Sequence, residues 1–344
     1  MRGSARIFFY SYRFGEVCDL GELRSDMARP RRRLGLAAAT VALQVGRGLA
    51  TTATERIGAL HIVFGAANIP HPAKAKKGGE DAYFCDDRCG TFGVADGVGG
   101  SASAKVDPGL FSREVLRRCH AALAQPHDSL LHAMEAAAAK ELTLGGSSTL
   151  LIGQLESASN TLRVSNLGDS GVMLLRPAFR RFSGGNFMWP RIVLRSFDQT
   201  HAFNTPYQTA ADDFAQATRR SDQLSTAAAE GDILIAATDG VLDNLFDQHI
   251  QNVVARSLSD LRKGDSDGNA AQLAVDALAD QIANEAHAIG LREDEEGLHT
   301  PFELAAAQER YKFLGGKLDD VAVVVGLVRA GEPPPEQRGL MSNF

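Results

Sequence analysis

Two aspartates in this sequence each follow an apolar run and stand directly before a glycine. Asp96 and Gly97 close one such run, and Asp239 closes a second, with Asp243 four residues further along the chain. Each run is typical of a buried strand, so each acid is carried to a strand end. Glycine allows a close backbone approach, so Asp96 and the Gly97 carbonyl could together offer two oxygen ligands to a hard cation.

A third acidic position lies at the opposite end of another apolar run. Asp319 and Asp320 directly precede a valine-rich segment at 321–325. Because one fold can bring several strand ends together, we expect Asp319 to meet Asp96 and Asp239 at one site. Ligation by oxygen atoms alone favours Mg²⁺ or Mn²⁺ over zinc. The sequence therefore predicts a centre for hard divalent cations.

A basic segment leads into a further pair of acids. Residues 74–77 contain three lysines, Lys76 among them, and two glycines separate this segment from Glu80 and Asp81. Positive charge beside carboxylates suits a metal site that must also receive an anion. The alternative interpretation is a solvated turn that carries a run of surface charge.

The rest of the pattern supplies elements that would position these acids. Gly168 and Asp169 lie between two apolar segments, which predicts a hairpin of adjacent antiparallel strands at 161–175. Residues 176–230 are the least regular part, and so long a connection inside a compact domain is usually functional. We also expect an edge strand at 57–66, a strand at 145–153, a last strand at 321–328, and helices at about 127–142, 245–262, 270–289 and from 301.

One more helix should begin at Asp107, an N-cap residue, with Pro108 at the first helical position. Its predicted apolar face consists of Leu110, Phe111, Val115, Leu116 and Cys119.

Bulk properties limit the classes of partner and site. The net charge of −6 and the pI near 5.9 argue against a general surface for nucleic acids or anionic membranes. Four cysteines in 344 residues are too few for a disulfide scaffold, so reduced thiols are favoured. The less favoured alternative is a zinc site built from Cys85, Cys89, Cys119 and His120.

The first 56 residues differ in composition from the rest of the chain. Between Met27 and Thr54 there are five arginines and no acid, which is typical of an organellar transit peptide. Acids before Met27 interrupt that pattern, which suggests Met27 as an alternative start. A secretory signal and a disordered tail are the competing interpretations. We therefore divide the chain into a targeting or disordered segment at 1–56, a catalytic domain at 57–330 and a disordered tail at 331–344.

Taken together, the motifs resemble those of the PPM, or PP2C-type, metal-dependent serine/threonine protein phosphatases. The resemblance covers nearly all of 57–330 and keeps the family's order of motifs, which makes it far more specific than any single motif. The matching segments are Gly79-Glu80-Asp81-Ala82, Val94-Ala95-Asp96-Gly97-Val98-Gly99-Gly100, Gly146-Ser147-Ser148-Thr149, Asn166-Leu167-Gly168-Asp169-Ser170, Thr238-Asp239-Gly240-Val241-Leu242-Asp243 and Leu318-Asp319-Asp320.

Within that family the chain is most similar to the mitochondrial PTC7-like branch and its plant relatives. This narrower resemblance depends on Val98, on Val106-Asp107-Pro108-Gly109 and on residues 201–208. It implies a location in the mitochondrial matrix, with plastid and cytosol as alternatives.

The resemblance implies an α+β fold, an α-β-β-α sandwich of two antiparallel sheets flanked by helices. It also implies a site of two Mg²⁺ or Mn²⁺ ions, with a weaker third, where activated water attacks phosphorus in line. Asp96, Asp239 and Asp319 would be the catalytic residues and metal ligands, assisted by the Gly97 carbonyl, Glu80 and Asp81, while Asp169 and Asp243 match positions linked to the third ion.

Two positions depart from the family pattern. Val98 stands where many members have a histidine that protonates the leaving group, and Lys76 stands where many hold phosphate with an arginine. A lysine binds phosphate as a point charge without the bidentate fork. We expect phosphoprotein substrates, no nucleic acid, no membrane span and a monomer. The alternatives are a catalytically weak regulatory protein of the same fold and a hydrolase of small phosphoesters.

Overall fold

The computed structural model describes residues 59–98, 107–125, 129–138, 145–182, 185–210, 219–263, 268–331 and 338–342. The predicted targeting segment at 1–56 lies outside the described residues, as do Gly99, Gly100 and Val106. Within the described residues, no helix has the length and apolar character needed to cross a membrane.

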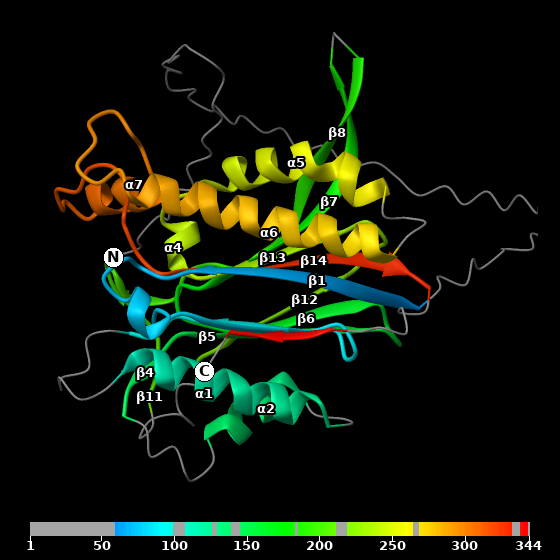
Figure 1. Cartoon of the computed structure of the whole chain (residues 1–344), viewed down its shortest axis with the longest axis horizontal. Helices are drawn as coiled ribbons and strands as arrows, with labels where there is room; N and C mark the ends of the chain where they lie inside the picture. Colours follow the sequence, from blue (N-terminus) through cyan, green and yellow to red (C-terminus); the bar gives the residue numbers. More distant parts are fainter. Residues whose placement is uncertain are drawn as a thin grey trace, which may run out of the picture. The chain divides into compact units, whose positions relative to one another are not determined.

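Two antiparallel sheets stack face to face at the centre of the described domain (Figure 1). The first sheet has the strand order β1-β14-β13-β7-β8, and the second has the order β12-β6-β5-β3-β2-β15. The strands of the first are β1 Leu60–Ile69, β14 Val321–Ala330, β13 Ile233–Ala237, β7 Gly171–Phe182 and β8 Gly185–Arg195. Those of the second are β12 Asp222–Ala227, β6 Thr161–Leu167, β5 Leu150–Glu156, β3 Thr91–Ala95, β2 Ala82–Asp86 and β15 Gly339–Met341.

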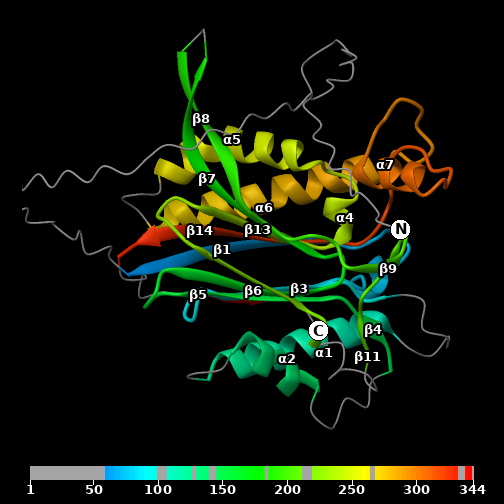
Figure 2. The same ribbon diagram turned by 180° about the vertical axis from the view of Figure 1, so that it is seen from behind.

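Helices cover the outer face of each sheet (Figures 1 and 2). Helices α5 and α6 lie on the first sheet, and α1 and α2 lie on the second. The predicted α-β-β-α sandwich is therefore confirmed. The helices are α1 Pro108–Leu123, α2 Leu130–Ala138, α4 Asp239–Leu242, α5 Asp247–Lys263, α6 Gly268–Gly290 and α7 Pro301–Gln308, with a 3₁₀ turn, η1, at Ala75–Lys77. Two small ladders complete the fold, β9 Thr200–Ala202 with β10 Thr205–Pro206, and β4 Ser147–Ser148 with β11 Thr209–Ala210.

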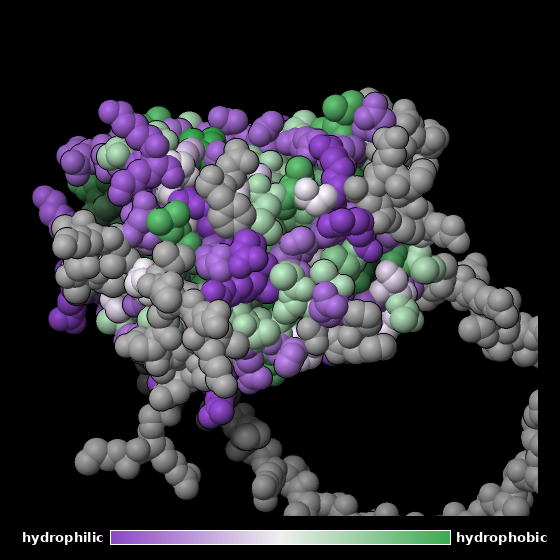
Figure 3. Space-filling model, turned by 60° about the horizontal axis from the view of Figure 1, so that its bottom comes forward, coloured by the Kyte–Doolittle hydropathy of each residue, from purple (hydrophilic) through white to green (hydrophobic). Residues whose placement is uncertain are grey.

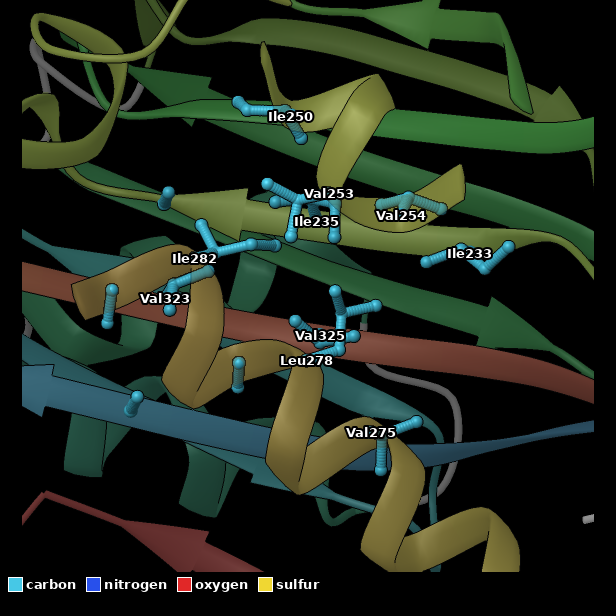
Figure 4. Close-up of a cluster of buried hydrophobic side chains, with 14 of the residues drawn as sticks. Ile233, Ile235, Ile250, Val253, Val254, Val275, Leu278, Ile282, Val323 and Val325 are labelled. Atoms are coloured by element: carbon cyan, nitrogen blue, oxygen red, sulfur yellow. The ribbon is translucent and has the colours of Figure 1, made fainter. Parts of the chain in front are cut away.

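Three layers of buried side chains hold this sandwich together. One lies between the two sheets, one between the second sheet and α1–α2, and one between the first sheet and α5–α6. In the last of these, Ile235 and Val323 of neighbouring strands meet Val253 of α5 and Ile282 of α6 (Figure 4). Strands β13 and β14 are buried on both faces, which explains why they read as continuous apolar runs rather than alternating ones.

Helix α1 begins as the sequence predicts, because the Asp107 carboxylate accepts a hydrogen bond from Gly109 N at 3.1 Å. Four of the five residues of its predicted apolar face are buried. Leu110 is the exception and is 45% exposed, so that part of the prediction is wrong. With 3.6 residues per turn, the stripe centred on Phe111 and Val115 leaves Leu110 at its margin.

The predicted hairpin at 161–175 is also wrong. Strands β6 and β7 belong to different sheets: β6 pairs with β5 and β12, whereas β7 pairs with β13 and β8. The chain crosses between the sheets at Gly168, whose φ of +108° is a conformation that favours glycine. The same turn signal serves a hairpin and a sheet-to-sheet crossing, since both need an abrupt change of direction after a buried strand.

Residues 176–230 contain more regular structure than expected. Strands β7 and β8 continue past the helices as a long two-stranded arm, visible in both ribbon views, and β9 to β12 follow. The predicted disordered tail at 331–344 contains a short strand, because Leu340 in β15 pairs with Cys85 at the edge of the second sheet. An exposed edge provides unpaired backbone groups that such a short segment can satisfy. The predicted helix at 127–142 is described only as α2.

The surface on the side of α1 and α2 mixes hydrophilic and hydrophobic residues (Figure 3). Among its coloured residues, no one extended hydrophobic area dominates the visible face.

Candidate metal centre

Four predicted acids lie at one end of the sandwich. Asp96 directly follows β3, Asp239 opens α4 two residues after β13 ends, and Asp319 stands two residues before β14. Strands β13 and β14 are antiparallel, with Ala237 opposite Val323, so the end of one strand lies beside the start of the other. Asp169 joins them because the crossing from β6 to β7 lies at this same end. The turn that misled the hairpin prediction therefore positions a site residue.

Two buried threonines fix the backbone around these acids. Thr149 Oγ1 accepts a hydrogen bond from Asp96 N at 2.9 Å, and Thr149 N donates to the Asp96 carbonyl, also at 2.9 Å. Thr238 Oγ1 donates to the Asp81 carboxylate at 2.6 Å and accepts from Ala322 N at 3.0 Å. The sequence motifs around Thr149 and Thr238 thus hold the acidic loops to the sheets. Both threonines are fully buried, so these bonds are shielded from water.

Burial and mutual repulsion dominate the electrostatics of the cluster. The pKa of Asp96 is raised well above its usual range, first by burial and then by the charges of Asp239, Asp81 and Asp319. The pKa of Asp81 is also raised well above its usual range, by burial and by the nearby charge of Asp320. Burial and Asp239 raise the pKa of Asp169 to about 8. Each carboxylate would therefore bind protons or cations more readily than an exposed one.

Lys317 is the point on which three of the acids converge. Its Nζ lies 2.6 Å from Asp243 Oδ2, 2.7 Å from Asp239 Oδ2 and 3.6 Å from Asp319 Oδ2. Burial alone lowers the pKa of Lys317, but these carboxylates raise it well above its usual value. The ammonium group is therefore charged, and it neutralises part of the cluster. Asn204, in the short β9–β10 turn, adds its Oδ1 at 3.4 Å.

Lys74 plays a comparable part on the other side of Asp319. Its Nζ lies 2.5 Å from Glu80 and 2.9 Å from Asp320, with Asp319 further away at 3.8 Å. Asp320 is almost fully buried and also accepts hydrogen bonds from His71 N at 2.7 Å and Glu80 N at 3.1 Å. Asp320 therefore ties the 71–80 segment to the start of β14, which places Glu80 beside the aspartates.

The donor set fits hard divalent cations. All the candidate ligand atoms are oxygens, and Asp81 Oδ1 and Asp169 Oδ1 are buried with no hydrogen-bond partner in the described part of the chain. Gly97 packs so tightly that a Cβ there would come within 2.7 Å of the carbonyls of Glu80 and Pro108. Among the described residues, no three acidic, histidine or cysteine side chains already stand in a metal-binding arrangement. The closest convergence of carboxylates, around Lys317, is occupied by its ammonium group.

Sequence reasoning found the acids but missed the cations between them. Lys76 is exposed on η1, and its role as a phosphate contact stays a prediction, whereas Lys74 contacts the acids. A usable signal existed for Lys317, because in an extended segment residues 317 and 319 lie on the same side. The sequence marked Asp320 as an acid but gave no signal for its partners, which are the Lys74 side chain and backbone groups far away in the sequence.

The residues of the zinc alternative have other surroundings. Cys85, Cys89 and Cys119 are free thiols, and burial raises the pKa of Cys85 and Cys119. Cys89 lies 3.0 Å from Thr91 Oγ1, and His120 Nε2 lies 2.8 Å from the Asp86 carboxylate. Cys119 and His120 lie on α1, which covers the second sheet, whereas Cys85 lies on β2 and Cys89 in the turn before β3.

Curated proteins that are similar to this chain in sequence are named as protein phosphatases of the 2C type. The chain is 33% identical over 282 residues to probable protein phosphatase 2C 80 of Arabidopsis thaliana, covering 80% of this chain and 61% of that protein. It is 31% identical over 293 residues to probable protein phosphatase 2C 1 of Oryza sativa subsp. japonica, covering 80% of this chain and 78% of the relative. Several other curated relatives are longer, and the chain spans 53% of two of them. No family model matches the chain.

A solved structure agrees with these sequence matches. The X-ray structure of the photosystem II phosphatase PBCP is 30% identical in sequence and superposes with a TM-score of 0.63. The match covers 78% of this chain and 99% of that one. The arrangement of sheets and helices is thus shared over nearly the whole of the solved chain.

Proposed function

The chain belongs to the protein phosphatase 2C family, and we propose that it is a metal-dependent phosphatase that hydrolyses phosphoserine and phosphothreonine in proteins. The observation that carries this proposal is the gathering of acids from separate strand ends at one end of the sandwich. Their raised pKa values express an excess of negative charge that divalent cations would relieve.

We propose that Asp96, the Gly97 carbonyl, Asp239 and Asp319 hold two Mg²⁺ or Mn²⁺ ions. Such ions would supply Lewis-acid activation of water and neutralise charge on the phosphoryl group. Glu80 and Asp81 would complete the ligand sets, and Thr149 and Thr238 would keep the acids oriented through the hydrogen bonds described above.

Lysine side chains near the acidic site would help to bind the phosphate group of the substrate. Lys74 is one-third exposed, so its ammonium group can meet an anion from solvent while it holds Glu80. Lys76, two residues further on, is fully available on η1 and is the proposed direct contact. Val98 has no proton to donate, so protonation of the leaving alkoxide must come from another group.

The test is phosphate release from a phosphothreonine peptide with and without Mn²⁺. We expect release that requires Mn²⁺ and falls by at least about a hundredfold in Asp239→Asn, because one charged ligand is lost. Asp232→Asn is the control, since Asp232 is also buried but lies before β13, at the strand's opposite end. Unchanged release in Asp239→Asn would refute the assignment of the site. Release from aryl phosphate alone would favour a hydrolase of small phosphoesters.

We further propose that the protein belongs to the PTC7-like branch and acts in the mitochondrial matrix. Support comes from Val98, from residues 201–208 and from the arginine-rich, acid-free composition of 27–54. The similarity to a phosphatase described as acting on photosystem II makes the plastid the main alternative.

A further inference from the structure

The backbone of Lys317 is held in place by hydrogen bonds to a buried side chain. The side-chain amide of Asn244 accepts a hydrogen bond from Lys317 N at 2.9 Å and donates to the Lys317 carbonyl at 2.8 Å. Asn244 is itself buried and donates to the Gly240 carbonyl at 2.9 Å. The backbone of Lys317 is therefore fixed to α4, the same helix that carries Asp239.

The ammonium group of Lys317 is surrounded by groups that stabilise a positive charge. Besides the carboxylates of Asp243, Asp239 and Asp319 and the Asn204 amide, the ring of Phe302 lies with its centroid 4.8 Å from Nζ. An aromatic face stabilises an ammonium group through its quadrupole. The side chain of Lys317 is only 15% exposed, so these contacts compete little with water.

These contacts distinguish Asp243 from Asp81 and Asp169. Lys317 holds Asp243 Oδ2 at 2.6 Å and Asp239 Oδ2 at 2.7 Å. Asp239 also faces the rest of the cluster, because its charge helps to raise the pKa of Asp96 and of Asp319, whereas Asp243 follows directly after α4. A divalent ion bound to Asp243 Oδ2 would lie next to a tethered positive charge, and like charges at such a distance repel strongly in a buried site. By contrast, Asp169 Oδ1 and Asp81 Oδ1 have no such partner in the described structure.

We infer that Lys317 is the built-in counter-ion of the Asp239–Asp243 pair and that its ammonium group excludes a metal ion from Asp243. The inference rests on the proposed function, because it concerns how many ions the same acidic site admits. Asp243 is then a positioning residue that acts through Lys317, and Asp169 lacks its expected co-ligand. Lys317 also neutralises the charge of Asp243, so that Asp239 does not lie beside an unpaired negative charge.

The experiment counts Mn²⁺ ions bound per chain on the full-length protein, by the loss of the free-ion signal in electron paramagnetic resonance. Lys317→Met removes the charge at similar length, and we expect it to bind one Mn²⁺ more than wild type. Lys317→Arg keeps the charge and should bind as many as wild type. Lys77→Met is the matched control, because Lys77 lies near the site but pairs with Asp107 at 3.6 Å, and it should gain no ion.

A second variant keeps the test decisive if Lys317→Met does not fold. Asp243→Asn in the wild-type background should leave the number of bound Mn²⁺ ions unchanged, and it should remove the extra ion from Lys317→Met. The loss of one ion from wild type on Asp243→Asn would overturn the inference, as would equal counts in wild type and a folded Lys317→Met. In both cases an active wild type leaves the proposed function standing. A wild type that binds no Mn²⁺ and releases no phosphate would overturn both.

Discussion

Replacing Asp320 should damage both the stability of the fold and the position of Glu80. Its Oδ2 accepts from Lys74 Nζ at 2.9 Å and from Glu80 N at 3.1 Å, and its Oδ1 accepts from His71 N at 2.7 Å. In Asp320→Asn the amide group can accept on only one side, so its NH₂ must face at least one of these donors. At least one backbone donor is then left unpaired in a site where the side chain is 1% exposed.

The expected loss follows from these contacts. A hydrogen bond to a charged group contributes about 1.5–3 kcal/mol, and breaking a buried ion pair costs about 3–5 kcal/mol. Lys74 keeps Glu80 as a partner at 2.5 Å, which reduces the second cost. We therefore expect Asp320→Asn to lower the free energy of unfolding by about 3 kcal/mol, a large share of the roughly 5–15 kcal/mol of a typical domain.

Urea unfolding measures the first effect, and the Mn²⁺ dependence of phosphate release measures the second. Asp232→Asn is the matched control, because Asp232 is also fully buried, is paired with Arg176 through two 2.7 Å hydrogen bonds and accepts from Ala229 N at 2.8 Å. Both variants should lose similar stability, but only Asp320→Asn should need at least about tenfold more Mn²⁺ for half-maximal release. Equal Mn²⁺ dependence in the two folded variants would show that Asp320 does not position Glu80.

Two further predictions concern acid stability and targeting. Burial raises the pKa of Asp86, but the hydrogen bonds from Arg88 and His120 together outweigh it and lower that pKa from 3.8 to about 2. The stabilisation by Asp86 is therefore complete above pH 3.8 and is lost as the pH falls through 2. Asp86→Asn should therefore lower the free energy of unfolding by about 2 kcal/mol at pH 7, with the difference from wild type vanishing near pH 2 in pH-dependent urea titrations. Residues 27–54 fused to a fluorescent reporter should direct it to mitochondria, and a reporter that stays in the cytosol or enters plastids would contradict that assignment.

The sequence predicted correctly those parts of the fold that depend on residues close together in the chain. Residues 91–95 and 233–237 are buried strands, as their apolar runs indicate; Asp96 follows the first directly, and Asp239 follows the second after Thr238. The Asp107 cap forms, and the helix predicted from 301 begins at Pro301 with Thr300 as its N-cap, because a helix start depends on side-chain and backbone groups within a few residues. Such features need no knowledge of what lies across the molecule.

The crossing at Gly168 could not be predicted by the same means. A two-residue turn between apolar segments favours a hairpin, but here Thr149 Oγ1 lies 2.8 Å from Ser170 Oγ, and Val172 N donates to Ser196 Oγ at 2.9 Å. These bonds tie the start of β7 to groups outside β6. Which sheet a strand joins is thus decided by partners distant in sequence, which no local pattern contains.

In the candidate site, too, local sequence pattern revealed the acids but not the contacts that they make with residues distant in sequence. The acids could be found because each stands at the end of its own strand. By contrast, the contacts of Lys317 with Asp239 and Asp243 and that of Asp320 with His71 join residues far apart in the sequence. Asp81, for example, has one oxygen held by Thr238, which is 157 residues away, and one with no hydrogen-bond partner in the described structure. An acid held on one side and open on the other is suited to binding a cation that arrives from solvent. An acid held by a tethered ammonium group, as Asp243 is by Lys317, is suited to excluding one.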